Sequence, residues 1–159
     1  MYKILQISII SLFCDQLSKL TMLYVLDLPL VGKIDVFPPY LQFTMAWNYG
    51  VNFGLFSGDS ALQRWLLIGF AVFVSAAIAI WLRRTPLSRL GLISGGLLIG
   101  GALSNALDRA IYGAVADFLN MSCCGLDNPF AFNLADVSIF AGAIGLVFFS
   151  DPPKAADTK

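Results

Sequence analysis

The sequence predicts an all-α membrane protein with four transmembrane helices and a small interfacial β element on the outer face. Three observations lead to this fold class: an apolar composition, four stretches of spanning length, and one stretch of alternating polarity. Of the 159 residues, 58% are hydrophobic and only 13% are charged, and the mean hydropathy is +0.77. Soluble domains average about 45–50% apolar and about 25% charged residues. The composition is therefore that of a membrane protein.

Four apolar stretches approach the roughly 20 residues that a membrane-spanning helix needs. We expect residues 1–159 to form a single integral-membrane domain. Its predicted spans are residues of about 4–26, 62–82, 90–107 and 133–149.

The turn between the second and third predicted spans sets the expected orientation. It contains Arg83, Arg84 and Arg89, and loops rich in arginine and lysine stay on the cytoplasmic side. Both termini should then be cytoplasmic, and the two longer connections, residues 27–61 and 108–132, should lie outside.

The connection between the first two spans carries a strand signal. From Leu41 to Phe56, odd positions are large and apolar, whereas even positions as far as Gly54 are polar or small. A period of two is typical of a strand with one apolar face. We expect this strand at the outer membrane surface, with Trp47 and Tyr49 at the level of the lipid headgroups.

The composition also excludes several kinds of chemistry. The chain has no histidine and no glutamate, and all ten acidic residues are aspartates. Histidine-containing zinc sites and Ser–His–Asp or Cys–His hydrolases are therefore excluded. Ten basic residues balance the ten acidic ones, so no nucleic-acid partner is indicated. The three cysteines, Cys14, Cys123 and Cys124, imply no disulfide framework.

Ionisable residues inside the predicted spans are candidate functional residues, because charge in a membrane is costly. Asp15 and Lys19 lie four residues apart in the first span and can pair on one helix face. For this pair alone, a structural ion pair and a functional role are equally open.

A larger set of polar residues gathers at the outer end of the predicted bundle. This concentration in a chain poor in charge favours a functional site. The set is Asn105, Asp108 and Arg109 at the end of the third span, Asp117 in the apolar segment after it, and Asn133 and Asp136 at the start of the fourth.

Two aspartates can perform chemistry there without histidine. Two carboxyls that share a site do not both ionise easily, so one acts as a base on water while the other acts as an acid on a substrate carbonyl. This is aspartyl peptide hydrolysis. A divalent metal needs several oxygen ligands, and no spacing in the sequence demands one, so we expect no metal and no cofactor.

Five motifs in order make the sequence resemble the bacterial lipoprotein signal peptidases (signal peptidase II). The resemblance covers nearly the whole chain. Two positions depart from the family pattern: Ser104 replaces a glycine, and Asn52 replaces a small residue. The motifs are Asp15-Gln16-x-Ser18-Lys19, Asn48-x-Gly50-x-Asn52-Phe53, Ser104-Asn105-x-x-Asp108-Arg109, Val115-x-Asp117-Phe118 and Phe132-Asn133-x-Ala135-Asp136.

The resemblance implies an intramembrane aspartyl endopeptidase with Asp117 and Asp136 as the catalytic residues. It implies a diacylglyceryl-modified prolipoprotein as substrate, cut just before the lipidated cysteine. It also implies a monomer among the lipids of the bacterial inner membrane, with the active site near the outer face. The implied supporting residues are Asp15, Lys19, Asn48, Gly50, Asn105, Asp108, Arg109 and Asn133.

The residues suggest how the two aspartates divide the work. Asn133 is a good N-cap, which would place Asp136 in the first helical turn, where backbone N–H groups and the helix dipole favour a carboxylate. Asp117 lies in an apolar stretch, where burial favours the neutral acid. We therefore predict Asp136 as the base and Asp117 as the acid.

Two other classes of protein remain as alternatives. One is a proton- or ion-coupled carrier or channel subunit that uses Asp15, Lys19 and Asp136 as its path. The other is a purely structural membrane partner. A path needs polar residues at intervals across the membrane, whereas here they cluster at one end, and a structural partner has no need of such a cluster.

Overall fold

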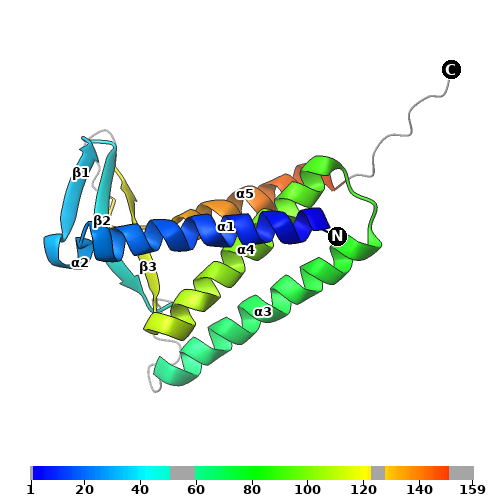
Figure 1. The fold of residues 1–159 in the computed structure, drawn as a ribbon, viewed down its shortest axis with the longest axis horizontal. Coiled ribbons are helices and arrows are strands. Elements are labelled where there is room, and N and C mark those ends of the chain that lie inside the picture. Colours follow the sequence, from blue (N-terminus) through cyan, green and yellow to red (C-terminus); the bar gives the residue numbers. More distant parts are fainter. Residues whose placement is uncertain (1, 51–59, 123–127, 151–159) are drawn as a thin grey trace.

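The computed structural model describes residues 2–50, 60–122 and 128–150. Within these residues the chain forms a helical bundle with a small sheet at one end (Figure 1). The long helices are α1 (Tyr2–Leu20), α3 (Ser60–Arg84), α4 (Arg89–Tyr112) and α5 (Leu134–Phe149). The shorter elements are the π-helical turn η1 (Thr21–Val25), helix α2 (Leu28–Val31) and strands β1 (Lys33–Phe37), β2 (Leu41–Asn48) and β3 (Val115–Met121).

A long helix forms in each of the four apolar stretches. Judged by length and composition, two helical segments of the described chain can cross a membrane, Ala61–Arg84 and Arg89–Tyr112. Helix α5 is apolar but shorter, and α1 carries Lys3, Asp15 and Lys19.

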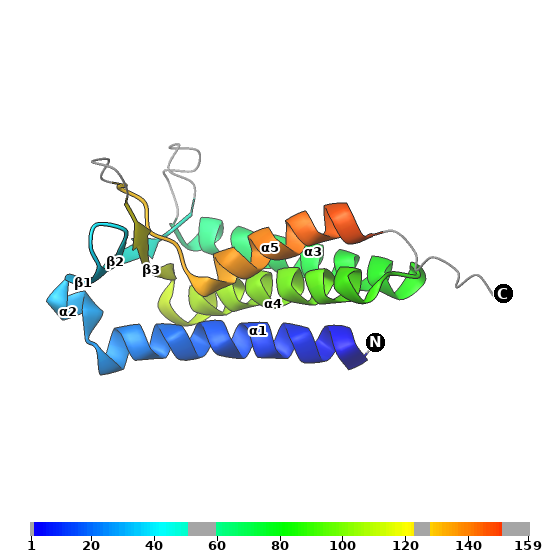
Figure 2. The same cartoon turned by 90° about the horizontal axis from the view of Figure 1, so that it is seen from above.

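Helix α4 is the centre of the bundle and packs against α1, α3 and α5 (Figure 2). Small residues allow the close approach. A Cβ at Gly100 would lie 2.5 Å from the backbone oxygen of Ser8 on α1. A Cβ at Gly142 of α5 would lie 2.6 Å from the backbone nitrogen of Leu98 on α4. Interfaces of this kind are typical of helices in lipid, where packing replaces the hydrophobic effect as the driving force.

The strands form one antiparallel sheet in the order β1-β2-β3. The strand predicted from the alternation is confirmed for Leu41–Asn48. Tyr49 and Gly50 are not part of a strand, and the last part of that stretch, residues 51–56, lies outside the described residues. The sequence pattern did not predict β1 or β3.

A buried apolar cluster fixes the sheet to the end of the bundle. It contains Met22 of η1, Leu28 of α2 and Phe118 of β3, and Phe43 of β2 packs against it. The rings of Phe43 and Phe118 meet edge to face, with centroids 6.2 Å apart. Because Phe118 is held in this cluster, the neighbouring Asp117 has a fixed place at the end of the helices.

Candidate active site

The register of the sheet brings Asn48 to Asp117. Ala46 pairs with Asp117 and Asn48 pairs with Val115 across strands β2 and β3. Val115 and Asp117 are two residues apart on one strand, so their side chains share a face. The Asn48 amide Nδ2 consequently donates to Asp117 Oδ2 at 3.0 Å.

A bridge between Leu119 and Phe132 brings the start of α5 to the same place. The next residue, Asn133, caps α5, as the sequence predicted. Its side chain accepts from the backbone N–H of Asp136 at 2.9 Å, and Asp136 accepts in return from the Asn133 backbone N–H at 3.2 Å. This reciprocal capping box satisfies two backbone donors of the helix end and fixes the Asp136 carboxyl.

Asn133 also connects the two candidate catalytic carboxyls, Asp117 and Asp136, which we call the carboxyl pair. While its backbone N–H and side-chain oxygen hold Asp136, its Nδ2 donates to Asp117 Oδ1 at 2.6 Å. Asn133 is fully buried. A change in the position of this one side chain would therefore move both carboxyls.

Three asparagines direct amide N–H groups at the carboxyl pair, and the orientation of each is determined by its other partner. The Asn48 oxygen accepts from the backbone N–H of Gly50 at 2.9 Å. The Asn105 oxygen accepts from Lys19 Nζ at 3.1 Å, and an ammonium can only donate. The Asn105 Nδ2 must then face Asp136, to which it donates at 2.8 Å.

Gly50 has a backbone role in this arrangement. Its φ is +87°, a conformation that residues with a Cβ rarely adopt. A Cβ there would also lie 2.5 Å from Leu67 Cδ1. A larger residue would displace the N–H that orients Asn48.

Burial raises the pKa of the Asp117 carboxyl from its usual 3.8 to about 6. The negative charge of Asp136 adds to this increase, whereas hydrogen bonds from Asn48 and Asn133 and the more distant charge of Lys19 lower the pKa. Desolvation outweighs the hydrogen bonds because Asp117 is only 3% exposed. Asp117 is thus more readily protonated than an ordinary aspartate, in the direction that its apolar segment predicts.

A second polar group lies deeper between the helices. Asp15, Lys19 and Asp108, which we call the ion cluster, are all at most 1% exposed. Lys19 Nζ lies 2.6 Å from Asp15 Oδ2 and 2.7 Å from Asp108 Oδ2. Together with Asn105, these partners use all three ammonium hydrogens. The Asp15–Lys19 pair suggested by the sequence is present, and Asp108 joins it.

Neutral donors complete the hydrogen bonding of the ion cluster. The Ser104 hydroxyl and the Ala135 backbone N–H each donate to Asp15 at 2.7 Å. Gln16 Nε2 donates to Asp108 at 2.7 Å, as does the Ala116 N–H at 3.2 Å. Such donors offset the excess negative charge of two carboxylates beside one ammonium.

The contributions of Gln16 and Ser104 were not predicted, although both lie in the motifs. Ser104, which departs from the family pattern, is fully buried and also accepts from Gln16 at 2.9 Å. Its hydroxyl is therefore integrated into the ion cluster. The other departure, Asn52, lies outside the described residues.

Arg109 lies beside the carboxyl pair, and its Nη1 hydrogen bond goes to the backbone rather than to either carboxyl. Its Nη1 donates to the backbone oxygen of Asn105 at 3.2 Å. In the part of the chain that the structure describes, no three His, Cys, Asp or Glu side chains gather as they would around a metal ion. The proposed absence of a metal stays a prediction.

Each member of the carboxyl pair lines a different hollow. Asp136 borders an apolar groove of about 440 Å³ with Phe132, Val137 and Phe140. Asp117 borders a more polar cavity of about 240 Å³ that includes Asn48. The carboxyl pair thus lies between an apolar hollow and a more polar one.

Two solved structures share this fold, and both are described as bacterial membrane enzymes. They superpose with TM-scores of 0.79 and 0.76 at 25% sequence identity, covering 93% of this chain and 92% and 87% of theirs. The fold is therefore that of a bacterial membrane enzyme.

The sequence comparisons define the family. The family described as signal peptidase (SPase) II matches residues 7–150. A lipoprotein signal peptidase of Methylobacterium sp. (strain 4-46) is 44% identical over 86% of this chain and 81% of its own length. One of Caulobacter vibrioides is 41% identical, over 91% of this chain and 83% of its own length. The chain belongs to the signal peptidase II family.

Proposed function

We propose that Asp117 and Asp136 are the catalytic residues of this peptidase, which removes signal peptides from prolipoproteins. The activity follows from the family and from relatives named lipoprotein signal peptidase. The observation that supports the two residues is the bridge through Asn133, which holds both carboxyls within one hydrogen-bonded unit.

The carboxyl pair supports general acid–base hydrolysis. Asp136 takes a proton from water while the water oxygen attacks the scissile carbonyl carbon, and protonated Asp117 donates its proton to the carbonyl oxygen. When the C–N bond of the resulting diol breaks, the proton on Asp136 passes to the departing amine, and a diol hydroxyl returns a proton to Asp117. Both groups regain their starting states.

The two hollows suggest how a lipid-modified substrate lies. Its acyl chains fit the apolar groove beside Asp136, whose Val137 and Phe140 are 46% and 72% exposed. The peptide fits the cavity beside Asp117 and Asn48. A diacylglyceryl-modified cysteine would then place the bond before it at the carboxyl pair.

The proposed setting is a single integral-membrane domain, residues 1–159, monomeric in the bacterial inner membrane. The helices α1, α3, α4 and α5 are its four spans, both termini are cytoplasmic, and the sheet and carboxyl pair lie near the outer face. Arginines at the opposite end of the bundle support this orientation. The carrier alternative is not favoured, because the polar residues lie together at one end.

The proposal is tested by incubating the purified protein with a lipidated and an unlipidated prolipoprotein and reading cleavage by gel shift. Asp117→Asn and Asp136→Asn should each lower cleavage of the lipidated substrate at least about a hundredfold, the scale of acid–base catalysis. Asp35→Asn, on the exposed strand β1, is the matched control and should cleave normally. EDTA should have no effect.

Substantial turnover by either Asn variant would refute the assignment of the carboxyl pair. Loss of activity on chelation would replace the aspartyl mechanism with a metal-dependent one. Equal cleavage of the unlipidated substrate would show that the apolar groove does not contribute to recognition of the lipid-modified cysteine.

A further inference from the structure

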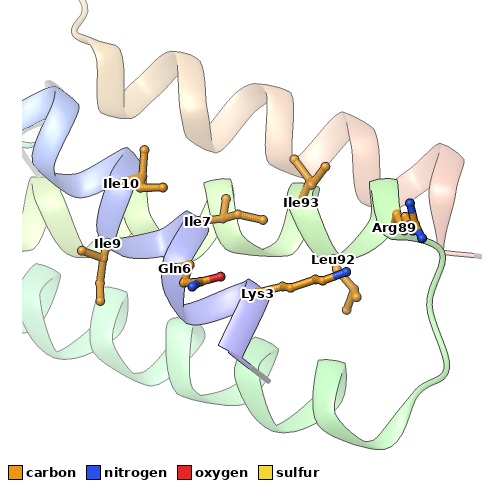
Figure 3. Close-up of a pocket in the computed structure, with 8 residues that line it drawn as sticks. All are labelled: Lys3, Gln6, Ile7, Ile9, Ile10, Arg89, Leu92 and Ile93. Atoms are coloured by element: carbon orange, nitrogen blue, oxygen red, sulfur yellow. The ribbon is translucent and has the colours of Figure 1, made fainter.

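A second groove lies at the end of the bundle away from the carboxyl pair. Figure 3 shows it between the first turns of α1 and α4. Its volume is about 570 Å³, larger than either hollow at the carboxyl pair. Its lining is Lys3, Gln6, Ile7, Ile9 and Ile10 of α1 and Arg89, Leu92 and Ile93 of α4.

The groove results from a change in side-chain size along the helix interface. At Gly96 the two helices meet closely, since a Cβ there would lie 2.7 Å from Ile7 Cβ. One turn earlier on α4, the residues that line this interface are Leu92 and Ile93 rather than glycine, and the groove opens between the helices. Its walls remain accessible, as Ile10 is 60% and Ile93 41% exposed. In a membrane this surface faces lipid chains.

The charges at this end are all positive in the described part of the chain. Lys3 and Arg89 border the groove, and Figure 3 shows the Lys3 side chain reaching toward α4 on the side of Arg89. Arg83 and Arg84 end the neighbouring helix α3. The aspartates of the described residues lie in the sheet, near it, or at the end that holds the carboxyl pair. An anion at Lys3 and Arg89 therefore meets no nearby carboxylate among these residues.

We propose that this groove binds one anionic glycerophospholipid of the bilayer. The headgroup phosphate lies between the Lys3 ammonium and the Arg89 guanidinium, and one acyl chain follows Ile7, Ile10 and Ile93 toward the membrane centre. Basic pockets between transmembrane helices bind anionic headgroups in this way. A free phosphate ion would use only the two cations, whereas a neutral lipid would use only the isoleucines. The combination selects an anionic lipid.

The test uses the full-length protein in detergent and native mass spectrometry. Phosphatidylglycerol and phosphatidylcholine with identical acyl chains are titrated separately. The protein should retain phosphatidylglycerol preferentially, at one molecule per chain. Each basic residue near a headgroup contributes a factor of about five in affinity, so Lys3→Gln with Arg89→Gln should weaken phosphatidylglycerol binding about 25-fold. Arg84→Gln, which removes a charge at the same end but outside the groove, is the matched control and should have little effect.

A second variant tests the acyl-chain part of the site. Ile93→Trp fills the groove without changing its charge and should also abolish the retained lipid. Undiminished binding in this variant or in the double variant, or equal retention of both lipids, would overturn the proposal. A dimer held through this surface without lipid would do the same. Cleavage of prolipoprotein in detergent should be normal in all these variants, so the outcome is independent of the catalytic assignment.

Discussion

The ion cluster and the carboxyl pair use the same acidic residue type at the same end of the bundle, yet their surroundings differ. In the ion cluster, Asp15 and Asp108 share the ammonium of Lys19 at 2.6 and 2.7 Å. In the carboxyl pair, the hydrogen bonds to Asp117 and Asp136 come from amide N–H groups. The aspartates of the ion cluster thus share a charged partner at contact distance, whereas those of the carboxyl pair are held by uncharged amide donors.

This difference separates a structural role from a chemical one. The carboxylates of the ion cluster, paired with Lys19 and bound by the Ala135 N–H, join α1, α4 and the start of α5. The two groups are linked through Asn105, which accepts from Lys19 and donates to Asp136. We therefore expect the ion cluster to position the carboxyl pair without entering the reaction.

The largest expected effect on stability is that of Lys19→Met. Removing the ammonium leaves two buried carboxylates without their cation, which costs about 3–5 kcal/mol. Thermal unfolding in detergent should show a large decrease in Tm. Lys33→Met is the matched control, because the Lys33–Asp35 pair at 3.4 Å is more than half exposed, and such pairs contribute about 0–1 kcal/mol. Equal Tm values for the two variants would contradict a structural role for the ion cluster.

A smaller loss of stability, together with a decrease in turnover, is expected for Asn105→Ala. The variant removes the hydrogen bond to Asp136 and the link to Lys19. Hydrogen bonds to charged groups contribute about 1.5–3 kcal/mol, so kcat should decrease about 10- to 100-fold. Because Asn105 touches no proposed lipid or peptide surface, KM should change little. An increase in KM at constant kcat would show that Asn105 serves substrate binding instead.

The smallest effects are expected in the titration of Asp117, followed by NMR of carboxyl-labelled aspartate. The wild-type carboxyl should titrate near pH 6, as burial raises its pKa to about 6. Asp136→Asn removes a negative charge that raises the pKa, so the Asp117 midpoint should move to lower pH. Asn48→Ala removes a hydrogen bond that lowers the pKa, so the midpoint should move to higher pH. Shifts of the same sign in both variants would refute this electrostatic description.

Features that depend on local sequence were predictable. Long apolar stretches predicted the helices, because a chain in lipid must hydrogen-bond its own backbone N–H and C=O groups, as a helix does. The alternation beginning at Leu41 predicted β2. The Asn133 cap with Asp136 in the first turn was also predictable from the sequence, since a capping box depends on two residues that are three positions apart.

The gathering of polar residues at one end of the bundle was predicted, but the individual tertiary contacts within it were not. Strand β3 is buried over most of its length, so it lacks the alternation that reveals a strand with one exposed face. The ion cluster required Asp108 to meet Lys19 from another helix, and the donors Gln16 and Ser104 completed it. The orientation of Asn48 and Asn105 depends on Gly50 and Lys19, which only the fold brings beside them.

The most direct test compares Asp108→Asn with Asp117→Asn, measuring Tm and prolipoprotein cleavage on the same preparations. Asp117→Asn should lose at least about a hundredfold in cleavage while its unfolding free energy stays within about 1 kcal/mol of wild type. Asp108→Asn breaks the ion cluster and should lose about 3 kcal/mol or more, with residual cleavage in the fraction that remains folded. If the two variants lost stability and cleavage in the same proportion, the distinction between a structural and a catalytic aspartate would be wrong.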